Sequence, residues 1–464
     1  MHHSTDLSFT LKYYMPVKPK LNSLAPATIN FWSACAFWLK LGFISFGGPA
    51  GQIAIMHQEL VEKRRWLSAQ RFQHALNYCM LLPGPEAQQL ASYLGWLMHG
   101  MAGGIIAGVL FVLPSCLILI ALAWIYMSYG HVPIIIGMFY GIKPAVTALV
   151  LCASYRLGRR VLHNALLWII AILAFAAVYC NAAPFPLIIG SAALLGGFGG
   201  KCWPHLFQTS QPQHSATTHM TPACIIDHNS PLPAHAQFSW RKLLTITGIG
   251  LCLWLTAIGG LTVYFGWSHP LTQMGWFFSK AALFTFGGAY AVLPYVYQGM
   301  VEHYHWLTAQ QMMDGLALGE TTPGPLIMVV TFTGFIAGWG QAIFGSEHLL
   351  LAGISAALVV TFFSFLPSFI FILAGGPFVE STHGDLKFTA PLTAISAAVT
   401  GVILNLALFF AQHVLWPNGI SGEIDAVAAI ISLLALMTLL RFKWSVIPVI
   451  AICGGIGYLL QHAN

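Results

Sequence analysis

Two lysines occupy equivalent positions in two apolar stretches of the chain. Lys40 lies six residues before Phe46, and Lys280 lies six residues before Phe286. A charged side chain inside a membrane is costly and needs a partner or a function. Two such lysines predict a site that holds a doubly charged anion. Alternatively, each lysine extends to the membrane surface or pairs with a buried carboxylate.

Motifs rich in glycine and proline follow each lysine. The first set is Phe46-Gly47-Gly48, Pro49 and Pro83-Gly84-Pro85, and the second is Phe286-Gly287-Gly288 and Pro323-Gly324-Pro325. Both residue types interrupt helices, and non-helical backbone at membrane depth must be covered by protein or line a cavity. Free N–H groups at the start of a half-helix favour an anion. We therefore predict that these motifs bind the substrate.

Two glutamates flank the Pro-Gly-Pro motifs. Glu86 follows the first motif directly, and Glu320 precedes the second by three residues. Ionisable residues inside membranes often serve as proton relays, so both are candidates for proton coupling or gating. Each could instead pair with Lys40, Lys280 or Lys143. Gln88 is a candidate donor to an oxyanion, or it could form a hydrogen bond between helices. We predict no metal and no cofactor.

The elements that must position these residues are membrane helices. Of 464 residues, 57% are hydrophobic and 7% are charged, whereas about 25% are charged in soluble proteins. Long stretches without any charge leave room for roughly ten to twelve membrane segments of about 20 residues, some only half-spanning. The composition predicts an all-α polytopic membrane protein with broken or re-entrant helices. It excludes a soluble enzyme and gives no sign of nucleic-acid binding.

The chain contains an internal repeat. Residues 46–85 and 286–325 match at an offset of 240, with 14 of 40 positions identical, and Leu113-Pro114-Ser115 matches Leu366-Pro367-Ser368 at an offset of 253. We predict a cytoplasmic N-terminal tail (1–30), a first repeat (31–203), a cytoplasmic linker (204–240) and a second repeat (241–464). The linker is rich in Pro, His, Ser and Thr, which cannot form a packed core.

Loop charges predict that the two halves cross the membrane in opposite senses. Basic residues of one half align with uncharged residues or histidines of the other: Lys63, Arg64 and Arg65 with His303, Tyr304 and His305; Arg156, Arg159 and Arg160 with Phe409, Gln412 and His413; Arg441 and Lys443 with Ile188 and Gly190. Lys and Arg mark cytoplasmic loops. We therefore favour an inverted-topology repeat over a parallel duplication whose loop charges drifted.

The motifs resemble the chromate transporter family in its long-chain, two-domain form. The resemblance rests on FGGPAGQIAIMHQELVEKRRWL, NYCMLLPGPEAQQLASYLGW and FGGAYAVLPYV with TTPGP, and it covers both halves. It implies export of chromate, a tetrahedral dianion shaped like sulfate, across a bacterial inner membrane, with chromate resistance. The second half has Ala289 where the first half has Pro49. This difference argues against equal roles for the two Phe-Gly-Gly motifs.

Other functions fit the same residues. A carrier of sulfate or another oxyanion would need the same site, because both anions are tetrahedral and doubly charged. An intramembrane enzyme would need clustered acids for a metal, or a nucleophile beside its base, and the 13 acidic residues are scattered. A passive anion channel is a third alternative. The expected partners are the oxyanion and the lipid bilayer, with a homodimer as a further option.

Overall fold

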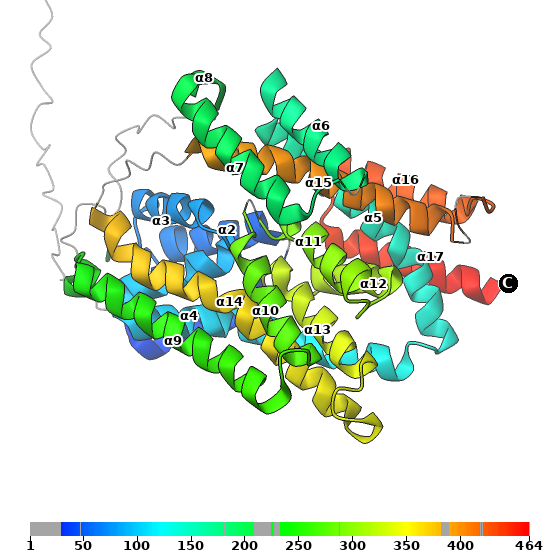
Figure 1. Ribbon diagram of the computed structural model, residues 1–464, viewed down its shortest axis with the longest axis horizontal. Helices are drawn as coiled ribbons and strands as arrows, with labels where there is room; N and C mark the ends of the chain where they lie inside the picture. The colour runs from blue at the N-terminus through cyan, green and yellow to red at the C-terminus, as the bar shows by residue number, and fades with distance from the viewer. Residues whose placement is uncertain are drawn as a thin grey trace, which may run out of the picture.

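The computed structural model describes residues 29–46, 48–180, 182–207, 224–226, 233–286, 288–381, 389–417, 419 and 421–463. This part of the chain is helical (Figure 1), apart from an isolated bridge between Leu67 and Ile226 that ties the linker to the first half. Gly47, Gly287 and most of the N-terminal tail lie outside the described residues. The predicted all-α architecture is confirmed.

The helices follow one another in two similar series. The first comprises α1 (Phe31–Ile44), α2 (Gly48–His57), η1 (Gln58–Lys63), α3 (Ala69–Leu81), α4 (Glu86–Tyr129), α5 (Pro133–Val161), α6 (Ala165–Tyr179) and α7 (Phe185–Cys202). Short α8 (Pro204–Phe207) and η2 (Ala234–Ala236) lie in the linker. The second comprises α9 (Trp240–Phe265), α10 (Pro270–Leu283), η3 (Ala289–Ala291), α11 (Leu293–Tyr297), η4 (Gln298–His303), α12 (Ala309–Thr321), η5 (Leu326–Met328), α13 (Val329–Gly340), η6 (Ser346–His348), α14 (Leu349–Ser381), α15 (Thr389–Leu415), α16 (Ala426–Leu440) and α17 (Val446–Ala463).

The repeat extends to details of local structure. Helices α3 and α12 each have 13 residues, and each begins at a hydroxyl side chain, Ser68 or Thr308, that accepts a hydrogen bond from a first-turn N–H. Such caps satisfy N–H groups that lack helical partners. A six-residue π-helical turn, η1 or η4, precedes each of them. The same local sequences therefore fold the same way in both halves.

The last two helices of each half shift the alignment predicted from the sequence. Helices α6 and α16 both have 15 residues, and α7 and α17 both have 18. Arg441 and Lys443 therefore correspond to Cys180 and Ala182, and their predicted alignment with Ile188 and Gly190 is wrong. The loop 416–425 before α16 is longer than the loop 162–164 before α6, which a constant offset cannot follow. The loop with Arg441 and Lys443 still corresponds to an uncharged loop in the first half.

The described chain contains both long and short apolar helices. Six helices are long and apolar enough to cross a membrane, and five shorter apolar helices accompany them. Helix α4 is broken at His99 and Gly100, where φ is −134° and +66°. The equivalent break in the second half is the loop 341–345 between α13 and η6. The predicted broken helices are therefore present in both halves.

The two halves are intertwined rather than stacked side by side. Helices α6 and α7 of the first half pack against α15, whereas α16 and α17 of the second half pack against α5 (Figure 1). Small residues allow this close approach: a Cβ at Gly141 of α5 would meet the Gly457 backbone of α17 at 2.8 Å, and one at Gly196 of α7 would meet Ala394 of α15 at 2.7 Å. Each half thus completes the other.

Equivalent helices run antiparallel where the halves meet. In α4 and α14, Gly104 faces Leu373 and Gly108 faces Phe369, so residue numbers rise along one helix as they fall along the other. Both helices are long and apolar enough to span a membrane. Antiparallel equivalent spans cross the membrane in opposite senses, as an inverted-topology repeat requires.

The Pro-Gly-Pro loops form a reciprocal junction between the halves. The Gly84 N–H donates to the Thr285 carbonyl at 2.7 Å, and the Gly324 N–H donates to the Ser45 carbonyl at 2.8 Å. Ser45 and Thr285 are equivalent residues that precede the two Phe-Gly-Gly motifs. Each loop is therefore satisfied by a backbone group of the opposite half. We call this region the junction.

The junction lies near the middle of the spanning helices. Ser115 is the central residue of the α4 segment that runs from Met101 to Tyr129, and it packs against Gly324. Its equivalent Ser368, near the middle of α14, packs against Gly84. These contacts place the broken backbone at mid-depth, where lipid offers no hydrogen-bond partner.

Replacing either junction glycine should destabilise the protein. Gly84 and Gly324 have φ of +133° and +113°, and a Cβ at Gly324 would lie 2.6 Å from the Ser115 Cβ. We expect Gly84→Ala and Gly324→Ala each to cost about 1–3 kcal/mol, measured as a lower thermal midpoint in detergent. Gly248→Ala is the control, because nothing lies within 4 Å of its Cβ position. A midpoint unchanged by both junction substitutions would contradict the packing.

Candidate functional site

Two glutamine side chains support the Pro-Gly-Pro loops. Gln52 Nε2 donates to the Gly324 carbonyl at 2.5 Å, and Gln89 Nε2 donates to the Pro83 carbonyl at 2.8 Å. Both glutamines belong to the first half, and valines stand at the equivalent positions 292 and 329. The first half therefore supplies side-chain amides to both loops, so the junction is symmetric in its backbone and asymmetric in its side chains.

Buried polar atoms without protein partners gather at the junction. Of the ten such atoms in the described chain, four are the Ser45 hydroxyl and the side-chain oxygens of Gln52, Gln88 and Gln89, and a fifth is the Ser364 hydroxyl, one helical turn from Ser368. An unsatisfied buried polar group costs about 1–3 kcal/mol, so such groups are expected to bind water or a polar ligand. Water or a polar solute at the junction would supply the partners that these atoms lack.

The predicted motif residues divide between the junction interior and its edge. Pro85, Gln88, Pro323 and Pro325 are buried with Gly84 and Gly324; Gly48, Pro49, Pro83, Glu86, Phe286 and Gly288 are half-buried, and Phe46 is exposed. The Gly84 and Gly324 N–H groups bind carbonyls of the opposite half. They stabilise the crossing and are not free to hold an anion, contrary to the expectation for the Pro-Gly-Pro breaks.

Both candidate glutamates face arginines of α5. Glu320 is buried and accepts a hydrogen bond from the Tyr290 hydroxyl, which lies two residues after Gly288. Arg156 interacts electrostatically with Glu320, and Arg160, one turn further along α5, interacts with Glu86. No ion pair within 4 Å joins either glutamate to these arginines among the described residues, so the basic face of α5 acts on both at longer range.

This arrangement differs from the partners considered from the sequence. Arg156 and Arg160 had been assigned to a cytoplasmic loop by their charge. Their spacing of four residues, which places both side chains on one helix face, is the signal that could have identified them. Tyr290 carried no signal in the sequence, because its equivalent in the first half is Ala50.

The two repeated lysines lie at the surface of the helix bundle. Lys40 is exposed on α1, whose opposite face buries Phe37, Trp38 and Leu41. Lys280 lines an open cavity of about 540 Å³ with Glu302, and its ammonium lies 5.6 Å from the Trp276 ring centre. No hydrogen bond or ion pair joins either lysine to the junction in the described part of the chain. The expected pair of lysines around a central dianion therefore does not form.

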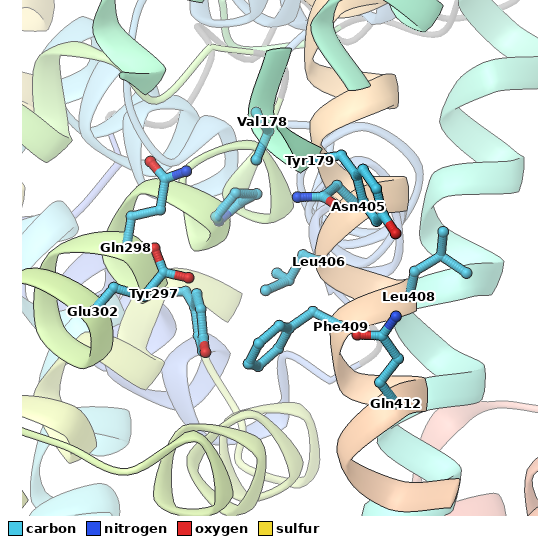
Figure 2. A pocket seen from close by; sticks show the side chains of 11 residues that line it. Val178, Tyr179, Tyr297, Gln298, Glu302, Asn405, Leu406, Leu408, Phe409 and Gln412 are labelled. Carbon is cyan, nitrogen blue, oxygen red and sulfur yellow. The ribbon is translucent and has the colours of Figure 1, made fainter. Parts of the chain in front are cut away.

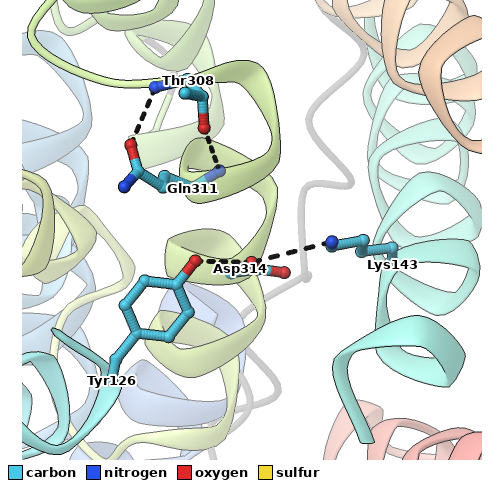
Figure 3. A network of polar contacts seen from close by, with 5 residues as sticks. All are labelled: Tyr126, Lys143, Thr308, Gln311 and Asp314. Atoms are coloured by element: carbon cyan, nitrogen blue, oxygen red, sulfur yellow. Dashed lines mark hydrogen bonds and ion pairs between the residues drawn. The ribbon is translucent and has the colours of Figure 1, made fainter. Parts of the chain in front are cut away.

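Lys143 pairs with an acid that the sequence had not singled out. Its ammonium lies 3.9 Å from the Asp314 carboxylate of α12, which also accepts a hydrogen bond of 2.9 Å from the Tyr126 hydroxyl (Figure 3). A capping box between Thr308 and Gln311 fixes the start of α12 one turn earlier. This network connects α4, α5 and α12, and so links the two halves.

A buried ion pair lies at the C-terminal end of α14. The Arg71 guanidinium lies 3.1 Å from the Glu380 carboxylate, and their side chains are only 6% and 2% exposed. The Tyr93 hydroxyl donates to the same carboxylate at 2.5 Å. The pair joins α3 and α4 of the first half to α14 of the second. Sequence repetition could not reveal it, because the equivalent positions are Gln311, Met127 and Thr333.

The fold and the junction together define a class of protein. Inverted repeats with broken helices that meet at mid-depth are the architecture of secondary transporters, and the apolar helices make this a multi-pass membrane protein. The chain belongs to the chromate transporter family, whose model matches residues 32–197 and 272–458. It is therefore a transporter and not an enzyme.

Relatives match this chain over most of its length. The chromate transport protein of Cupriavidus metallidurans is 29% identical over 92% of this chain and 93% of its own. The chromate transport protein of Pseudomonas aeruginosa is 30% identical over 94% of both chains. The uncharacterized transporter YwrB of Bacillus subtilis is 30% identical over 30% of this chain and 71% of its own. No solved structure matches this chain.

The buried and exposed ion pairs should differ sharply in their effect on stability. Glu380→Gln leaves the Arg71 charge buried without a partner, and we expect a loss of about 3–5 kcal/mol. Glu59→Gln removes the pair with the exposed Lys63, and we expect a loss of about 0–1 kcal/mol. The thermal midpoint of each purified variant measures the difference. Equal midpoints would show that the Arg71–Glu380 pair is not buried as described.

Proposed function

We propose that this protein exports chromate across a bacterial inner membrane and thereby confers chromate resistance. Two full-length relatives are named chromate transport proteins, and chromate is a tetrahedral dianion that accepts hydrogen bonds at four oxygens. The observation that carries the proposal is the pair of buried hydroxyls, Ser45 and Ser364, that lack protein partners and can donate hydrogen bonds to an oxyanion. They lie where the broken helices of the two halves meet.

The junction offers two kinds of group to an oxyanion. The Ser45 and Ser364 hydroxyls are buried and can donate to its oxygens, and the amides of Gln52, Gln88 and Gln89 can exchange their present hydrogen bonds for it. Positive charge comes from α5, where Arg156 and Arg160 interact electrostatically with Glu320 and Glu86. We assign proton coupling or gating to these two glutamates, because each shares its arginine with the approaching anion.

The membrane potential favours this direction of transport. Moving one charge across the membrane is worth about 2.3 kcal/mol per 100 mV, and a dianion that leaves a negative-inside cell gains this for each of its charges. Export is therefore electrically downhill without a coupled ion. A sulfate carrier would use the same groups, since hydroxyls, amides and guanidinium ions recognise any tetrahedral oxyanion.

Flux measurements with junction variants test the proposal. Labelled chromate is followed into inside-out vesicles at an imposed potential, with sulfate as competitor. We expect saturable uptake that falls at least tenfold in Ser45→Ala with Ser364→Ala, because a hydrogen bond to a charged group is worth about 1.5–3 kcal/mol and about 1.4 kcal/mol is tenfold.

Thr438→Ala serves as the matched control, since this exposed hydroxyl bonds only within α16. Uptake of sulfate in preference to chromate would make the protein a sulfate carrier with the same site. Absence of saturable flux for both anions would refute the transport function.

A further inference from the structure

Two cavities occupy equivalent places in the two halves. The first, of about 510 Å³, lies between α5, the end of α16 and the loop that follows it, and is lined by Tyr155, Arg156, Arg159, Arg160 and Lys443 with two leucines. We call it the basic cavity. The second, of about 220 Å³, lies between α6, α11 with η4, and α15 (Figure 2). We call it the neutral cavity.

The repeat relates these cavities residue by residue. Tyr155, Arg156 and Arg159 of the basic cavity correspond to Leu408, Phe409 and Gln412 of the neutral cavity, all on α15. Its two leucines, at the end of α16, correspond to Val178 and Tyr179, which end α6. Because the repeat is inverted, equivalent cavities open toward opposite sides of the membrane. They are the two mouths of one symmetric scaffold.

The two cavities differ in the charge of their lining residues. Four cationic side chains and no carboxylate line the basic cavity. Arg156 also donates to the Leu439 carbonyl at 3.2 Å, and Arg159 lies 5.8 Å from the Tyr155 ring centre. Neither Arg159 nor Lys443 has an ion-pair partner among the described residues. In the neutral cavity, no Lys or Arg is among the lining residues, and Glu302 points toward the space (Figure 2).

We propose that the basic cavity captures the transported oxyanion at the cytoplasmic mouth and that the neutral cavity releases it on the opposite side. This inference rests on the proposed function and deepens it. A cleft lined by charges of one sign concentrates the opposite ion, so a dianion accumulates at Arg159 and Lys443 and is repelled by Glu302. The positive-inside rule places the basic mouth in the cytoplasm.

One residue connects the capture site to the junction. Arg156 lines the basic cavity and also interacts electrostatically with Glu320. Glu320 accepts a hydrogen bond from Tyr290, two residues after the second Phe-Gly-Gly motif. An anion that leaves Arg159 for Arg156 therefore moves toward the mid-depth site. A phospholipid head group offers the same oxyanion chemistry, but it would remain at the membrane surface and gain nothing from this inward connection.

The test combines binding with sided transport. The variant Arg159→Gln with Lys443→Gln removes both unpaired charges, and Arg159→Lys with Lys443→Arg retains them. We expect the first to raise the half-saturating chromate concentration at the cytoplasmic face about tenfold or more, with a nearly unchanged maximal rate. The charge-retaining variant should resemble wild type. Right-side-out vesicles, which present the other mouth, should show no change. Unaltered half-saturation at the cytoplasmic face would overturn the proposal.

Two further arms separate the remaining explanations. Equilibrium binding of labelled sulfate and chromate to the purified protein in detergent should weaken about tenfold in the Gln variant. Binding that weakens in this way without any flux in wild type would retain the capture site and refute transport. A variant effect that appears only in vesicles containing cardiolipin, and not in pure phosphatidylcholine, would assign the cavity to a lipid head group and overturn the proposal.

Discussion

A backbone N–H group at the middle of a membrane must find its acceptor within the protein, because lipid offers none. In this transporter the broken helices solve the problem reciprocally: the Gly84 N–H binds the Thr285 carbonyl, and the Gly324 N–H binds the Ser45 carbonyl. Neither half can satisfy its own Pro-Gly-Pro loop in this way. Helices α6 and α7 also pack on α15 of the second half, and α16 and α17 pack on α5 of the first. The structural unit is therefore the whole chain and not either repeat.

Symmetry of the backbone and asymmetry of the side chains have different consequences. The backbone creates equivalent halves and equivalent mouths, and an inverted repeat of this kind would move a solute equally well in both directions. Substitutions on that scaffold then distinguish the two sides, as Arg156 against Phe409 and Arg159 against Gln412 illustrate. At the junction, Gln52 and Gln89 serve both loops from the first half alone. A few side chains can therefore give the two faces different half-saturating concentrations without a change of fold, while the membrane potential and the solute gradient set the net direction of transport.

Much of the fold could be predicted from the sequence, because low charge, long apolar runs and repeated Gly and Pro motifs act locally. The residues around the site were harder to assign. In an apolar membrane helix, hydrophobic periodicity does not show which face meets lipid, so Lys40 seemed buried although it is exposed. Contacts that have no equivalent in the other half, such as Tyr290 with Glu320, leave no trace in a repeat. A constant offset also missed the longer loop before α16.

The most direct test of this account is the side of the membrane on which equivalent residues lie. Lys63 and His303 are exposed, equivalent positions at the ends of η1 and η4. In a chain whose nine native cysteines are replaced, Lys63→Cys and His303→Cys would be treated separately with a membrane-impermeant maleimide. We predict that Lys63→Cys reacts only in inside-out vesicles and His303→Cys only in right-side-out vesicles. Reaction of both from the same side would contradict the inverted repeat, and with it the two opposite mouths.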